Sequence, residues 1–166
     1  MEIRGIRADE WAALRDLRLR ALEDSPDAFS SLLDDERAQP DERWRDLARR
    51  GAAGESDSIV VASDPAGLFG MAGAFVPQPG GAAVVWGMWV DPRRRGSGAG
   101  GAMLDALVAW AREVPGVRGL HLSVTEGNAP AEALYLGFGF ETTGRREPLR
   151  EGSELSAAEM ELSLVG

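Results

Sequence analysis

The chain has 166 residues, of which 44% are hydrophobic and 27% are charged, so it is long enough for one domain with a buried core. Its net charge of −9 argues against a general nucleic-acid-binding protein. It has no cysteine, and its 18 basic residues are all arginine, which excludes disulfides, thiolate metal sites and lysine nucleophiles. No apolar run approaches the ~20 residues that span a bilayer. We expect one cytoplasmic domain over residues 1–166 that needs no metal, membrane or nucleic acid.

The first part of the chain has the apolar spacing of helices. A helix is predicted over residues 9–22, and the Ser25-Pro26 pair ends it because a residue before proline disfavours helical geometry. Residues 29–39 leave room for a short helix. A second helix is predicted over residues 41–50, with Gly51 as its stop.

The apolar period then changes from that of helices to that of strands. Residues 58–63 and 68–76 predict a β-hairpin, because 64-DPAG-67 between them suits a tight turn. Residues 82–90 predict a third strand, apolar on both faces and therefore central. The remaining predicted elements are a helix from about residue 103 to Pro115-Gly116, a strand over 120–124, a short helix over 130–136, and strands over 140–145 and 159–164 joined by a loop over 147–156.

The segment 91-DPRRRGSGAGG-101 lies between a predicted strand and a predicted helix. Free N–H groups and the positive end of a helix dipole meet at such a point, which is typical of an anion site. Each glycine in the first turn of a helix costs roughly 0.5–1 kcal/mol relative to alanine. A cost of this kind is usually tolerated where a ligand must approach the backbone closely.

One interpretation of this segment is a dinucleotide-binding turn, because residues 96–101 match G-x-G-x-x-G. That motif normally follows its strand directly and has an acidic residue about 20 positions later. Here residues 91–95 intervene, and residues 117–124 contain no carboxylate. A nucleotide-dependent oxidoreductase is therefore retained only as an alternative.

The other interpretation reads residues 95–100 as R-x-x-G-x-G, preceded by Val90-x-Pro92. A second block, 128-NAPAEALYLGFGF-140, has the pattern N-x-x-A-x-x-L-Y-x-x-x-G-F. Together, in this order, the two blocks resemble the GNAT superfamily of N-acetyltransferases. The resemblance implies an α/β (α+β) fold, in which a mixed, mostly antiparallel sheet with one splayed parallel strand pair is flanked by helices.

The resemblance also implies acetyl-CoA as the co-substrate. Its pantetheine arm would lie between the splayed strands as an extra strand, and its pyrophosphate would meet the N–H groups of the glycine turn. The residues implied in binding are Met88, Trp89, Val90, Arg95, Gly96, Ser97, Gly98, Ala99, Gly100, Asn128 and Tyr135.

Three chemical roles follow for the attack of an amine on a thioester. The resemblance implies the Val90 backbone N–H as the donor to the oxyanion and Tyr135, the one tyrosine of the chain, as the general acid to the sulfur. The predicted central strand has no ionisable side chain to act as base. Glu126 is the nearest carboxylate in sequence, and a water relay is the alternative.

The resemblance therefore implies an enzyme that transfers acetyl from acetyl-CoA to a primary amine of unknown identity. The charge of −9 favours a cationic small molecule or an exposed protein amine as the acceptor. A non-catalytic module that binds coenzyme A on the same fold is the second alternative, and a homodimer is left open.

Overall fold

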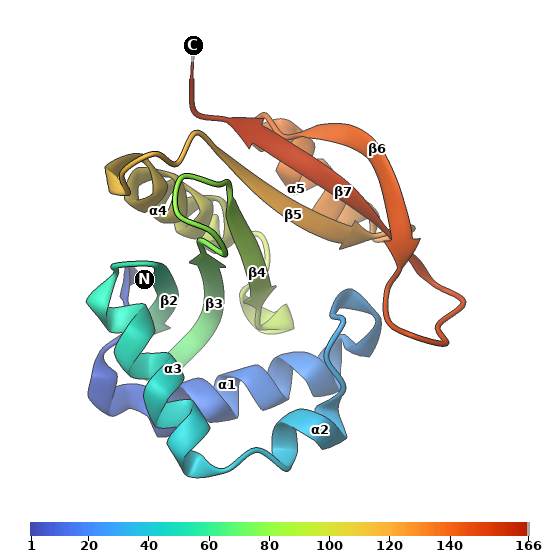
Figure 1. Cartoon of the computed structure of the whole chain (residues 1–166). Helices are drawn as coiled ribbons and strands as arrows, with labels where there is room; N and C mark the ends of the chain where they lie inside the picture. The colour runs from blue at the N-terminus through green and yellow to red at the C-terminus, as the bar shows by residue number, and fades with distance from the viewer. Residues whose placement is uncertain (166) are drawn as a thin grey trace.

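The computed structural model describes residues 1–165, which form a seven-stranded sheet (Figure 1). The strand order is β1-β2-β3-β4-β5-β7-β6, and every neighbouring pair is antiparallel except β4–β5. The strands are β1 (Glu2–Gly5), β2 (Asp57–Asp64), β3 (Gly67–Phe75), β4 (Ala83–Val90), β5 (Gly119–Thr125), β6 (Glu141–Pro148) and β7 (Ser156–Ser163). The expected mixed, mostly antiparallel sheet and its central third predicted strand are confirmed.

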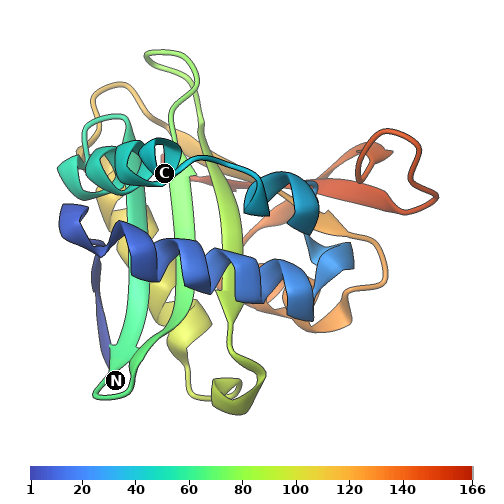
Figure 2. The same ribbon diagram turned by 90° about the horizontal axis from the view of Figure 1, so that it is seen from below.

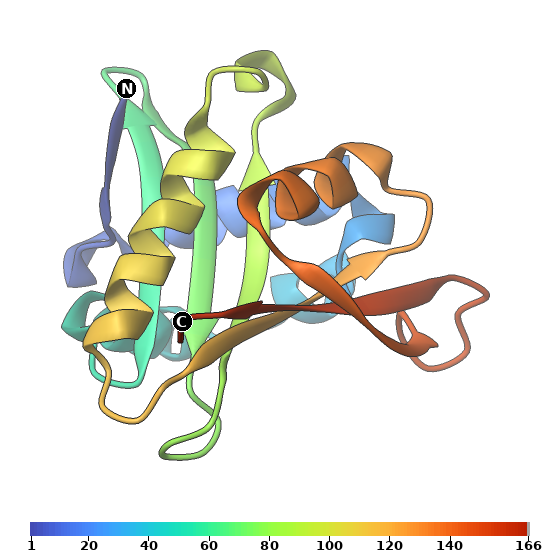
Figure 3. The same cartoon turned by 90° about the horizontal axis from the view of Figure 1, so that it is seen from above.

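Helices cover both faces of this sheet, and each face has its own hydrophobic core. The helices are α1 (Trp11–Asp24), α2 (Leu33–Arg37), α3 (Asp41–Ala53), α4 (Ala99–Glu113) and α5 (Ala129–Phe138). Figure 2 shows α1 and α3 across one face, and Figure 3 shows α4 and α5 on the other. Within the described part of the chain, no helix combines the length and the apolar character that crossing a membrane requires.

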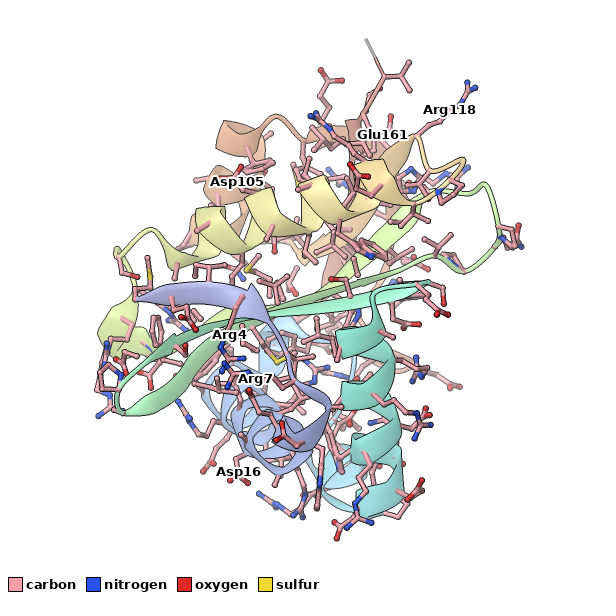
Figure 4. All side chains as sticks on the ribbon, turned by 90° about the vertical axis from the view of Figure 1, so that its left-hand side faces the viewer. Arg4, Arg7, Asp16, Asp105, Arg118 and Glu161 are labelled. Atoms are coloured by element: carbon pink, nitrogen blue, oxygen red, sulfur yellow. The ribbon has the colours of Figure 1, made fainter. Side chains whose placement is uncertain are left out.

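The first strand was not predicted from the sequence. β1 has only four residues, and it forms the edge of the sheet by pairing with β2, for example Ile3 with Ala62. A strand this short shows no clear alternation of apolar and polar residues. Charged contacts hold the following turn: Arg4 and Arg7, neighbours in Figure 4, both bind Glu10, with Nη1–Oε1 distances of 2.9 and 3.5 Å.

The predicted end of the second helix was wrong, because α3 continues through Gly51 to Ala53. Gly51 serves close packing instead: a Cβ atom there would lie 2.7 Å from Cγ1 of Ile59 on β2. The helix ends at Gly54, whose left-handed φ of 70° suits a C-cap. The loop predicted over 147–156 is also shorter, since β6 extends to Pro148 and β7 begins at Ser156.

The parallel pair β4–β5 is hydrogen-bonded only at its beginning. Its register covers Ala83 with Leu120 and Val84 with His121, after which the strands diverge (Figure 3). On its other side, β4 is bulged against β3 around Gly87, which has a φ of +67°. The bulge and the divergence leave the last residues of β4 without a strand partner on the β5 side.

Two glycines at the end of α5 give a prediction about folding stability. Gly137 is helical with open space around it, so Gly137→Ala should raise the free energy of unfolding by about 0.5–1 kcal/mol. Gly139 caps the helix at a φ of +114°, so Gly139→Ala should lower it by roughly 1–2 kcal/mol. Urea denaturation of both variants beside the parent chain measures the two shifts. Shifts of equal sign would contradict the assignment of Gly139 as the cap.

Candidate active site

A cleft of about 850 Å³ opens where β4 and β5 diverge. Its walls are the end of β4, the turn before α4 with the first residues of that helix, the segments 24–28 and 125–128, and the residues Pro130, Ala131, Leu134 and Leu155. The structure brings ten of the predicted donor-binding residues to this cleft: Met88, Trp89, Val90, Arg95, Gly96, Ser97, Gly98, Ala99, Gly100 and Asn128. Glu126 also lines it, whereas Tyr135 is not among the lining residues.

The glycine turn offers backbone rather than side chains to this cleft. Gly96 and Gly98 have φ values of +82° and +87°, and a Cβ atom at either would meet nothing within 4 Å. Gly98 is the N-cap of α4 and provides no side-chain cap, so the first-turn N–H groups remain available. One of them, that of Ala99, contacts Ser97 Oγ at 3.4 Å. Such a terminus is suited to an anion.

Asp91 organises the turn from the end of β4. Its carboxylate is buried and accepts a hydrogen bond from the Arg93 backbone N–H at 2.9 Å. On the same group, Arg20 of α1 donates to Oδ2 at 3.0 Å. The hydrogen bonds from Arg93 lower the pKa of Asp91 to about 2. The carboxylate is therefore charged at neutral pH, and it links the turn to α1.

The three arginines of the turn are all paired with carboxylates. Arg93 binds Asp91, and Arg94 binds Asp64 on β2. Arg95 reaches across the cleft, where Nη2 lies 2.9 Å from Oδ2 of Asp24 and Nε donates to the Val90 carbonyl at 3.0 Å. These pairs neutralise much of the positive charge that the sequence shows, so the backbone N–H groups are the main unpaired donors of the turn.

Asp24 was not predicted from the sequence, although it joins two walls of the cleft. Its Oδ2 atom accepts hydrogen bonds from Ser25, Arg95 and Trp89, whose indole nitrogen lies at 3.0 Å. The hydrogen bond from the Ser25 hydroxyl is the main reason why the pKa of Asp24 is lowered. The end of α1 is thereby attached to the end of β4.

The backbone of Val90 faces the gap between the diverging strands. Asp91 donates its N–H to the Phe69 carbonyl of β3 at 2.8 Å. Because successive strand residues point their N–H groups to opposite sides, the Val90 N–H points away from β3 and toward β5. An N–H group placed in this way can donate to a ligand in the cleft.

Tyr135 and Asn128 occupy opposite ends of the first two turns of α5. The Asn128 side chain caps the helix by accepting a hydrogen bond from the Ala131 N–H at 3.4 Å. Tyr135 is buried and packs edge-to-face on Phe140, with the ring centroids 5.8 Å apart. Burial raises the pKa of Tyr135 to about 12, so its hydroxyl stays protonated at neutral pH.

Glu126 follows β5 and is partly exposed at the edge of the cleft. Its Oε1 atom lies 3.0 Å from Nε of Arg146 on β6. The carboxylate of Glu126 is therefore already engaged in an ion pair at the cleft.

Contacts between distant segments close the far side of the cleft. Arg150, in the loop between β6 and β7, donates to the carbonyls of Pro26 and Phe29 at 2.7 and 3.0 Å. Thr125 of β5 donates its hydroxyl to the Asp27 carbonyl at 2.6 Å. No spacing in the sequence indicates these contacts, because the partners are about 100 or more residues apart.

Comparisons with known proteins agree with this geometry. Residues 11–140 match the sequence profile of the Acetyltransferase (GNAT) family. Two mycothiol acetyltransferases, from Salinispora tropica and Salinispora arenicola, are 35% and 36% identical to the chain over 140 residues. The matched region covers 82% of this chain and 42% of each relative, so the chain spans about two fifths of their length.

Solved structures share the fold. An acetyltransferase of the GNAT family from Streptococcus pneumoniae superposes with a TM-score of 0.82 at 21% identity, covering 98% of this chain and 99% of that one. The Salmonella typhimurium protein yncA, solved with its cofactor acetyl-CoA, gives a TM-score of 0.80 at 19% identity, with 100% and 95% covered. Since the family profile covers most of the sequence, the chain belongs to the GNAT family of acetyltransferases, which take their acetyl group from acetyl-CoA.

Proposed function

We propose that this acetyltransferase transfers the acetyl group to a primary amine, which reaches the thioester in the same cleft. The observation that carries the proposal is that one cleft contains both the glycine turn and the end of β4. The turn suits the pyrophosphate of the coenzyme, while the unpaired β4 backbone suits its extended pantetheine arm.

The chemistry begins when a neutral amine attacks the thioester carbonyl. The carbonyl oxygen becomes an oxyanion, and the Val90 N–H is the proposed donor that stabilises it. Collapse of the tetrahedral intermediate breaks the carbon–sulfur bond and releases the coenzyme as a thiolate, and the amine nitrogen loses one proton. Tyr135 is the proposed donor to the sulfur. A phenol with a pKa of about 12 is a weaker acid than a thiol, so its main contribution is a hydrogen bond to the developing thiolate.

The proton from the amine has two proposed routes. In the first route, the ion pair with Arg146 breaks and Glu126 accepts the proton directly. In the second route, water carries the proton to the solvent. As the acceptor we propose a primary amine on a small molecule or a protein, because the net charge of −9 attracts cations.

The first functional prediction concerns the glycine turn. Gly100→Val should weaken acetyl-CoA binding at least tenfold, about 1.4 kcal/mol, because its branched side chain would fill the cleft beside Leu134, where a Cβ atom would lie 3.3 Å from Cδ2. Gly100 is preferable to Gly98, whose positive φ would add backbone strain. Calorimetric titration measures the affinity, with Gly137→Val as a control at a helical glycine outside the cleft lining. Equal acetyl-CoA affinity in a folded Gly100→Val variant would show that the pyrophosphate does not bind at this turn.

The second functional prediction concerns Tyr135. Tyr135→Phe keeps the buried ring and removes only the hydroxyl, so kcat should fall by about 10²–10³, the scale of one lost donor to a developing charge. Acetyl-CoA affinity should change by less than about 1.5 kcal/mol, the scale of one neutral hydrogen bond. Steady-state kinetics with an amine substrate, beside a calorimetric titration, separates the two effects. Full activity of the phenylalanine variant would make Tyr135 a packing residue.

The third functional prediction distinguishes the two proton routes. If Glu126 is the base, Glu126→Gln should lower kcat by roughly 10²–10⁴ while acetyl-CoA affinity is kept. Arg146→Gln is the matched control, since it frees the carboxylate and should leave kcat equal or higher. Turnover of Glu126→Gln close to that of the parent enzyme would assign the proton to water.

A further inference from the structure

A second cavity, of about 210 Å³, lies on the face of the sheet that α1 and α3 cover. It shares no lining residue with the acetyl-CoA cleft. Its lining includes three charged side chains and three aromatic ones: Arg18, Glu36, Arg43, Trp44, Phe75 and Trp86. Arg18, Glu36 and Trp44 are buried, whereas the Arg43 side chain is 44% exposed. Buried charges of this kind are rare in proteins.

Arg18 of α1 is the central charged group of this cavity. Arg18 is only 7% exposed, and its guanidinium lies 4.8 Å from the ring centroid of Phe29 and 5.6 Å from that of Trp86. The Nη1 atom is fully buried, and no acceptor contacts it among residues 1–165. A buried cationic donor without an acceptor is strongly disfavoured, so a ligand that provides one would be bound well.

A second unpaired donor lines the same cavity. The indole nitrogen of Trp44, a residue with no exposed surface, also lacks an acceptor within the described chain. Glu36 is already engaged, because Arg43 donates to its Oε2 at 3.2 Å. The cavity lining therefore carries two cations and one anion, a net charge of +1.

We propose that this cavity binds the carboxylate of a small organic acid. A carboxylate carries one negative charge and offers two oxygens, which matches one unpaired guanidinium and one unpaired indole N–H. Phe75 and Trp86 provide apolar walls for the rest of the ligand. The volume of about 210 Å³ exceeds the roughly 150 Å³ of a cavity that holds benzene, so it suits an acid the size of benzoate.

The acid can be a separate ligand or the carboxylate end of the acceptor amine, in which case the inference rests on the proposed function. The bulge of β4 brings the cavity close to the cleft: a Cβ atom at Gly87 would lie 3.6 Å from Arg18 Nη1, and the next residue, Met88, lines the cleft. The experiment therefore has one arm that measures binding and one that measures turnover.

In the binding arm, benzoate and its neutral counterpart benzamide are titrated calorimetrically into the purified protein. Benzoate should bind at least tenfold more tightly than benzamide. Arg18→Met should remove this preference, and Trp44→Phe, which deletes only the second donor, should weaken benzoate severalfold. Arg49→Met, at an exposed arginine on α3 outside the cavity lining, should change nothing. If Arg18→Met does not fold, Trp44→Phe and Arg43→Gln test the preference for benzoate over benzamide, which should decrease in both variants.

In the turnover arm, 4-(aminomethyl)benzoate and benzylamine are compared as acceptors. If the acceptor provides the carboxylate, Arg18→Met raises KM for the first amine and not for the second. If a separate acid occupies the cavity, benzoate binds without competing with either amine.

Equal binding of benzoate and benzamide, or unchanged benzoate affinity in Arg18→Met, would overturn the proposal and leave a water-filled cavity. Failure to acetylate any amine would count against the proposed function alone, since the binding arm does not depend on turnover.

Discussion

The separation of β4 from β5 is the constraint on which the rest of this structure depends. Inside a sheet, a strand edge without a partner leaves backbone N–H and C=O groups that must be satisfied in another way. Here the bulge at Gly87 turns the end of β4 away from its neighbour. The sheet therefore has an unpaired stretch of strand edge at its centre, and an extended ligand can form hydrogen bonds with it. The position of the Val90 N–H follows from this one irregularity, and in the proposed function the recognition of the coenzyme follows from it as well.

The open section requires support from elements that do not pair with it. Asp91 provides one support by holding the turn to Arg20 of α1, and Asp24 provides another through Trp89 and Arg95. Both carboxylates have lowered pKa values, so they remain charged at neutral pH. The arginines of the turn therefore act first as structural residues, and they hold the glycine backbone in place for an anion.

Local patterns in the sequence were sufficient for most of the fold and for ten of the residues that line the cleft. The change from helical to strand period located the hairpin and the central strand, and the two motif blocks located the residues of the cleft. Gly51 was misread because a glycine required for close packing on Ile59 looks identical to one that ends a helix. The partners of Arg95 and Arg150 were out of reach, because Asp24 and Pro26 approach them only after folding. The cavity around Arg18 was also missed, since its position on α1 resembles that of any surface arginine.

The contacts of Arg150 have a consequence for how this enzyme can change its specificity. The guanidinium joins the β6–β7 loop to the carbonyls of Pro26 and Phe29, so these two segments beside the cleft are held together by one side chain. Substitutions in one segment will shift the other, and their effects on acceptor choice will not be additive. New specificities should therefore arise through paired changes in both segments, in natural descent as in directed evolution, while the cofactor side remains as it is.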